Sequence, residues 1–161
     1  TSSPTGPPAD GPSFPDPEVL DVDSTGLIGR LQSFVDEHDV ADRVDFASSI
    51  STIRSRGGDV IPSFGGYTAD TTNTEIADSC TSVSSIASAI ENVISKYNLH
   101  RVDFDIEQDS LTNKAGIDRR NKALKQVEAW ASAAGRSLQV SYTLPTNTDG
   151  LDSGGKYVLS N

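Results

Sequence analysis

The sequence contains a single cysteine, Cys80, among its 161 residues. One cysteine excludes an intramolecular disulfide and any metal cluster built from several thiolates. No base is recognisable near Cys80, so we interpret it as a small buried or loop thiol rather than a nucleophile. The sequence also lacks a run of about 18 apolar residues, and it therefore predicts no membrane-spanning helix.

Basic residues are scarce. Lys and Arg number 13 against 23 Asp and Glu, which gives a formal net charge of -10. Such a field repels nucleic acids and anionic membranes, whereas a neutral polysaccharide would be indifferent to it. Asp supplies 17 of the acids and Lys occurs only five times. This bias would suit a protein that works in high salt, and we keep a halophilic source as a hypothesis.

Proline is concentrated at the start of the chain, where residues 1–17 hold six of the eight prolines among Ser, Thr and Gly. Such a stretch cannot bury apolar surface and is typical of a linker or tail. It also lacks the basic and apolar regions of a secretory signal. We therefore place a boundary after residue 17 and predict one domain over residues 18–161.

Four segments carry apolar residues at helical spacing and are predicted helices: 25–38, 45–56, 84–97 and 118–134. Gly57-Gly58 and Gly135 follow two of them and suit helix ends. Trp130 falls among the apolar positions of the fourth segment and is expected in the core. A last helix is expected to begin near residue 150.

Three short segments are predicted strands: 59–64, 101–106 and 138–144. They alternate with the predicted helices in the order strand, helix, strand, helix, strand. That order is typical of βαβ units with a parallel sheet, an α/β fold.

The most informative stretch is RVDFDIE at residues 101–107. Alternation along a strand puts its three acids, Asp103, Asp105 and Glu107, on one face at steps of about 6.6 Å. Mutual repulsion would raise at least one carboxyl pKa and could keep an acid protonated near neutral pH. A protonated acid beside an ionised neighbour is what glycoside cleavage needs.

Two other interpretations of this strand stay open. It could be a solvated edge strand with an acidic outer face, or a site for Mg²⁺ or Ca²⁺, which carboxylates at this spacing can hold. If helices cover only one side of the sheet, the acids would point into a barrel lumen or toward its mouth.

Two motifs resemble glycoside hydrolase family 18, the chitinases. DFDIE at residues 103–107 resembles the D-x-x-D-x-D-x-E signature of the fourth barrel strand, and SFGG at 63–66 matches the S-x-G-G motif of the third. VSYTLP at 140–145 resembles the fifth strand of a microbial subgroup. The resemblance covers about residues 57–161. It implies a partial (β/α)8 TIM barrel, because a complete barrel takes about 250 residues, and further chain segments would have to complete it.

The resemblance also implies roles for the matching residues. Glu107 would be the general acid, and Asp105 would orient the substrate's N-acetyl group, which attacks in place of a protein nucleophile. Asp103 would lie behind Asp105, Ser63 would hydrogen-bond this inner pair, and Gly65-Gly66 would let the backbone pass close to it. The family's first Asp and its following Gly are here His100 and Arg101.

Two tyrosines are candidates for sugar contacts. Tyr67 follows the glycines and could stack on a sugar ring, although a plain loop aromatic is an equal alternative. Tyr142 could line the site, yet alternation puts it with Val140 and Leu144 on the face toward the helices, leaving Ser141 and Thr143 inward. His38 and His100 have no visible partner.

The resulting expectation is a secreted, extracellular chitinase that hydrolyses β-1,4-linked N-acetylglucosamine polymers with retention of configuration. No cofactor and no metal are implied, and chitin or a chitooligosaccharide is the expected partner. The alternative is a non-catalytic protein that binds chitin on the remnant of a chitinase barrel.

Overall fold

The structure is a computed structural model that describes residues 46–160. The predicted linker over residues 1–17 and the predicted helix over 25–38, with His38, lie outside the described residues. The predicted domain start at residue 18 lies there too.

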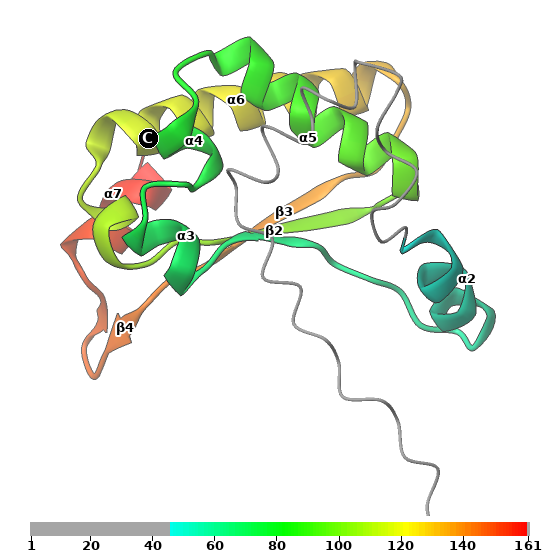
Figure 1. The fold of residues 1–161 in the computed structure, drawn as a ribbon, viewed down its shortest axis with the longest axis horizontal. Helices are drawn as coiled ribbons and strands as arrows, with labels where there is room; N and C mark the ends of the chain where they lie inside the picture. The colour runs from blue at the N-terminus through cyan, green and yellow to red at the C-terminus, as the bar shows by residue number, and fades with distance from the viewer. Residues whose placement is uncertain (1–45, 161) are drawn as a thin grey trace, which may run out of the picture.

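Three parallel strands form the sheet, in the spatial order β1 (Ser63–Gly65), β2 (Arg101–Asp105) and β3 (Gln139–Thr143). Helix α5 (Val83–Tyr97) connects β1 to β2, and α6 (Lys114–Ala133) connects β2 to β3. Both helices lie together over one face of the sheet (Figure 1). The predicted α/β order of strands and helices is therefore confirmed.

The core lies between this face of the sheet and the two helices. Val102, Phe104 and Ile106 are fully buried on β2 and just after it, as their alternation predicted. The Phe104 ring stacks on that of Phe64 with centroids 5.1 Å apart. The buried helix residues are Ile86, Ala87, Ile90 and Ile94 on α5 and Ile117, Ala123, Leu124, Val127 and Ala131 on α6. Burial of these stripes supplies most of the driving force for folding.

The helix ends follow capping chemistry. Ser82 accepts a hydrogen bond from Ser85 N at the start of α5, and Asn98 ends that helix with a left-handed φ of 48°. Helix α6 begins four residues before the predicted position because Asn113 caps it, accepting a hydrogen bond from Gly116 N. Trp130 is half-buried and packs against the core at the helix edge rather than inside it.

The first predicted strand is shorter than expected. Pairing with β2 covers only Ser63–Gly65, and Ile61 is 50% exposed. Pro62 has no N–H to donate to a ladder, and only its carbonyl pairs, with Asp103 N. Helix α2 (Ala47–Ser55) forms as predicted but buries none of its residues.

Several short elements were not predicted. Helices α3 (Tyr67–Thr71) and α4 (Ile76–Ser79) follow β1, and the 3-10 helix η1 (Gln108–Leu111) follows β2. A hairpin of β4 (Thr146–Asn147) and β5 (Gly150–Leu151) follows β3 (Figure 1). The last predicted helix therefore begins later, as α7 (Ser153–Ser160). None of the described helices has the length and apolar character needed to cross a membrane.

Candidate active site

The predicted acids come together at the edge of the sheet where all three parallel strands end. Strand β2 lies between β1 and β3, so its acidic face belongs to a central strand. The interpretation as a solvated edge strand is therefore wrong. Asp103, Asp105 and Glu107 are each half-buried, on the face opposite the buried Phe104.

Asp103 is held by hydroxyl groups from both neighbouring strands. Its carboxylate accepts hydrogen bonds from Ser63 Oγ (2.8 Å), Ser141 Oγ (2.6 Å) and Thr143 Oγ1 (3.0 Å). The strand register causes this, because Ser63, Asp103 and Ser141 lie side by side across the sheet. The geometry thus contains a contact of Ser63 with Asp103, one of the two acids predicted for it, and it adds two donors from β3.

Asp105 has a different environment from Asp103. Its Oδ1 is buried and receives no hydrogen bond from any residue in the described part of the chain. Burial raises the pKa of the Asp105 carboxyl, and the nearby carboxylates of Glu107 and Asp103 raise it further. The buried Oδ1 and the two neighbouring carboxylates therefore both favour the neutral form of Asp105.

Gly65 and Gly66 bring the β1 backbone against Asp105. Both have left-handed φ values, 103° and 92°, and Gly66 N donates a hydrogen bond to the Asp105 carbonyl at 2.8 Å. A Cβ on Gly65 would lie 2.2 Å from that carbonyl oxygen, which is backbone and cannot rotate away. Close approach and backbone conformation therefore both require glycine at position 65.

Gly65→Ala is expected to lower the free energy of unfolding by about 3–5 kcal/mol, since it combines a steric clash with backbone strain. Gly135→Ala is the matched control: φ there is 66°, and a Cβ added at this position would meet no atom within 4 Å from the described residues beyond its chain neighbours. That variant should lose only about 1–2 kcal/mol, the cost of the left-handed conformation. Urea unfolding of the two variants measures both values. Equal losses would show that the approach to Asp105 is not what requires Gly65.

Glu107 lies where the chain leaves β2. Its side chain does not cap η1, so its carboxyl is not engaged with the helix that it precedes. The next residue, Gln108, has a left-handed φ of 41°, an uncommon conformation for a residue with a Cβ. Such a bend is typical of sites where the surrounding structure imposes a side-chain position. The Glu107 backbone N–H donates a hydrogen bond to Asp70 Oδ2 at 2.5 Å.

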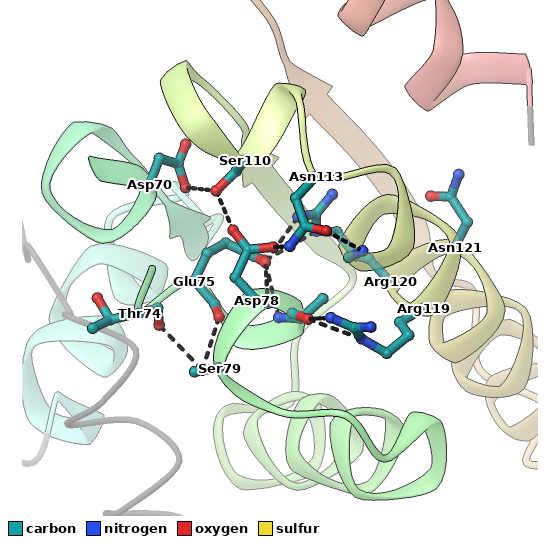
Figure 2. A network of polar contacts seen from close by, with 12 residues as sticks. Asp70, Thr74, Glu75, Asp78, Ser79, Ser110, Asn113, Arg119, Arg120 and Asn121 are labelled. Atoms are coloured by element: carbon teal, nitrogen blue, oxygen red, sulfur yellow. Dashed lines mark hydrogen bonds and ion pairs between the residues drawn. The ribbon is translucent and has the colours of Figure 1, made fainter. Parts of the chain in front are cut away.

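Asp70 belongs to a polar network beneath this edge that the sequence analysis missed (Figure 2). Asp70, Glu75, Ser110 and Arg120 are all 0% exposed. Figure 2 shows them joined with Asp78 and Asn113, from segments between residues 70 and 120. The sequence offered only the polar residues between β1 and α5 as a signal for this network. Polar residues in such a segment are equally typical of a surface loop.

Burial raises the pKa of Asp70 to about 7 and also raises the pKa of Asp78. The Glu75 carboxylate accepts hydrogen bonds from Arg120 Nε at 2.9 Å and from the Ala77 N–H at 2.8 Å. Glu75 therefore joins α4 to α6 through a buried ion pair.

The two candidate tyrosines lie in different environments. Tyr67 begins α3 directly after Gly66 and is 66% exposed, and its contact with a sugar stays a prediction. Tyr142 lies on the helix-covered face, 5.8 Å from the Phe104 ring, and its hydroxyl donates to Asn121 Oδ1 on α6. Burial raises the pKa of Tyr142 to about 12. The fold therefore does not bring Tyr142 to the carboxylates, and its placement in the sugar site is corrected. The reason is strand alternation, which puts Tyr142 on the face that the helices cover.

The metal interpretation of the acidic strand gains no geometric support. Within residues 46–160, no three or more His, Cys, Asp or Glu side chains are arranged to hold a metal ion. Cys80, the one thiol, is half-buried, with its Sγ 3.7 Å from the Ser82 carbonyl.

Known proteins resemble this chain over most of its length. It is 36% identical over 113 residues, 70% of the chain, to a probable bifunctional chitinase/lysozyme of Escherichia coli (strain K12). The same identity and coverage hold for Endochitinase 11 of Metarhizium anisopliae. The crystal structure of active domain 2 of a chitinase from Pyrococcus furiosus, solved as catalytic-site mutants, matches 71% of the chain with a TM-score of 0.58 and 26% identity. No family model matches the chain.

The chain spans only part of each of these proteins. The shared segment is 12% of the Escherichia coli protein and 21% of the Metarhizium protein. It covers 34% of the Pyrococcus chain.

Proposed function

We propose that this chain belongs to the chitinase family along the segment that it shares with these relatives, and that it carries the acid-catalytic strand of a chitin-cleaving site. The observation that carries the proposal is the contrast between neighbouring acids. Asp103 accepts three hydroxyl donors, whereas Asp105 Oδ1 is buried without a donor beside Glu107. This contrast favours the neutral, proton-bearing form of Asp105, directly beside the residue that we propose as the general acid.

The proposed reaction is substrate-assisted hydrolysis with retention. The N-acetyl carbonyl oxygen of the substrate attacks the anomeric carbon while the glycosidic C–O bond breaks, and Glu107 gives its proton to the leaving oxygen. Water then attacks the same carbon and gives a proton to Glu107, now acting as the base, while the bond between that carbon and the N-acetyl oxygen breaks and restores the N-acetyl group. Asp105 would hold the N-acetyl group by its N–H, and Asp103 would fix Asp105 from behind.

The substrate side of the proposal is a polymer of β-1,4-linked N-acetylglucosamine. A formal net charge of -10 favours a neutral polymer over a polyanion. Tyr67 is exposed next to Gly66 and could stack on a sugar ring. Secretion into the extracellular space follows from a polymeric substrate and is part of the proposal.

The fold of the whole site would be a partial (β/α)8 barrel. Three parallel strands with two covering helices match 34% of the related Pyrococcus chain, a share that fits a fraction of a barrel. Further segments would then supply the remaining wall of the sugar site. A second candidate function is the binding of chitooligosaccharides without cleavage, which the 66% exposed ring of Tyr67 beside Gly66 favours.

Release of a fluorophore from a chitotriose glycoside tests the function, with the matching glycoside of glucose as control. The two substrates differ in the N-acetyl group, so only the first should be cleaved, and its first product should be the β-anomer by NMR. Equal cleavage of both would contradict substrate assistance. Binding of chitotriose by calorimetry without cleavage would support the binding function instead.

A further inference from the structure

We propose that Asp70 is a positioning residue for Glu107, and that Asp70 and Asp78 share one buried proton through the Ser110 hydroxyl. Asp70 Oδ2 accepts the hydrogen bond of the Glu107 backbone N–H, and Asp70 Oδ1 lies 3.1 Å from Ser110 Oγ. Ser110 Oγ lies 2.5 Å from Asp78 Oδ2 (Figure 2). The hydroxyl thus stands between two carboxyl groups.

The Ser110 hydroxyl cannot supply a hydrogen to both carboxyl groups. A serine hydroxyl has one hydrogen and can donate to one acceptor at a time. An ionised carboxylate can only accept, so two ionised groups would leave one of the two contacts without a hydrogen. Both contacts are hydrogen bonds when one carboxyl is protonated and donates to Ser110 Oγ while the hydroxyl donates to the other. Burial of Asp70 makes an unsatisfied contact costly.

The outer ends of this chain are already occupied. Asp78 Oδ1 accepts a hydrogen bond from Asn113 Nδ2 at 2.7 Å. Asn113 Oδ1 accepts from Gly116 N at the start of α6, which orients the amide with its nitrogen toward Asp78. Asp70 Oδ2 is likewise taken by the Glu107 N–H. The proton therefore belongs on the two oxygens that face Ser110.

The surrounding charges favour retention of this proton. Glu75 and Arg120 form a buried pair, with Oε2 and Nη2 2.8 Å apart, so this guanidinium is already matched by a carboxylate. With Glu75 and Arg120 neutralising each other, two further ionised acids would give these four groups a charge of about -2, whereas the shared proton gives about -1. Arg119 on α6 adds one positive charge nearby, where it donates to the Ala77 carbonyl. The pKa of Asp70 is raised by burial and by Glu75, and the positive charge of Arg120 opposes this. Of the elements packed against α3, β1 has no titratable side chain and η1 adds only the exposed Asp109.

The network acts on Glu107 through the backbone. The amide that Asp70 accepts belongs to Glu107 itself, at the point where the chain leaves β2 and turns at Gln108 with its left-handed φ. Helix α3, which carries Asp70, starts directly after Gly66, whose N–H binds the Asp105 carbonyl. The network thus links the positions of the two proposed functional carboxyls. This inference rests on the proposed function only for the role of Glu107.

NMR of the full 161-residue chain tests the proposal without any need for turnover. The chemical shift of the Glu107 backbone amide proton should change with pH with a midpoint near pH 7, matching the Asp70 pKa of about 7. The same titration should persist in a Glu107→Gln background, where the carboxyl of residue 107 is gone. Asp70→Asn should abolish this titration, because its amide accepts the same N–H and donates to Ser110 permanently. Asp78→Asn should shift the midpoint down by at least one pH unit, because its amide donates to Ser110 and leaves Asp70 ionised. Asp59→Asn, an exposed acid outside the network, should leave the midpoint unchanged.

The two isosteric variants also form a double-mutant cycle. Each single Asn should leave the thermal midpoint within a few degrees of wild type at pH 6, since it mimics one protonated carboxyl. The double variant has two amide donors facing one hydroxyl, and its loss should exceed the sum of the single losses. Additive losses, an amide that does not titrate, or equal responses of Asp70→Asn and Asp78→Asn would overturn the shared proton.

Failure of the proposal and failure of the proposed function give different results. If the chain cleaves no chitotriose but the Glu107 amide titrates as described, the positioning network stands and the activity does not. If turnover occurs, Asp70→Asn and Asp78→Asn should move the alkaline limb of the pH–rate profile in opposite directions, although each removes one carboxyl group. If the two residues had a purely structural role, both variants would change kcat while their pH–rate profiles kept the same alkaline limb. That result would contradict the positioning role.

Discussion

Glu107→Gln is expected to lower turnover of a chitotriose glycoside by about 10²–10⁴-fold, the usual contribution of a general acid. Glutamine has nearly the same shape and keeps a carbonyl acceptor, but it cannot give a proton to the leaving oxygen. Glu107 does not cap η1 and is half-buried, so the substitution removes no described helix cap. Binding of chitotriose by calorimetry should therefore stay within about twofold, since ground-state contacts are retained.

Asp109→Asn is the matched control for this variant. Asp109 is an exposed acid two residues further along, on η1, and its neutralisation removes the same formal charge from the same region. Its turnover should stay close to wild type. If both variants lost the same activity, a general field effect would explain the loss and Glu107 would not be the proton donor. Unchanged turnover in Glu107→Gln would dismiss it directly.

Glu75→Gln is expected to lower the free energy of unfolding by about 3–5 kcal/mol, because it leaves the Arg120 guanidinium buried without a counter-charge. Both side chains are 0% exposed, and their nearest charged atoms are 2.8 Å apart. The glutamine carbonyl can still accept from the Ala77 N–H, so the cap of α4 is largely kept. The loss should therefore report mainly on the ion pair, and urea unfolding with a two-state fit measures it.

A second ion pair, exposed to solvent, serves as the comparison for the buried one. Arg54 and Asp59 form a pair with the same 2.8 Å separation, but their side chains are 31% and 48% exposed. Asp59→Asn should lower the free energy of unfolding far less than Glu75→Gln does, because water screens an exposed pair. Adding Arg120→Met to Glu75→Gln should recover part of the loss, since it removes the uncompensated charge. Similar costs for Glu75→Gln and Asp59→Asn would show that burial does not control the energy of this pair.

The segments that could be predicted have strong, local signals. The stripe of Ile86, Ile90 and Ile94 predicted α5 to within one residue at its start, and the alternation of Val102 and Phe104 with acids predicted β2. Such patterns work because burial of one face imposes a period of 3.6 or 2 on the sequence itself. Short elements such as α3 and η1 carry too few residues for a period to appear, and they escaped prediction.

The sequence by itself determined the α/β order and the acidic face of β2, and the resemblance of its SFGG motif implied the close approach of glycine beside that strand. The sequence also determined that Tyr142 shares parity with the apolar face, because side chains alternate along any strand. Only the tertiary structure decided that β2 is central, that Ser141 and Thr143 join Ser63 on Asp103, and that Asp70 lies under Glu107. These contacts join residues 37 to 40 positions apart. Strand register and helix packing alone set such distances, since no local period in the sequence encodes which buried acid will meet which donor.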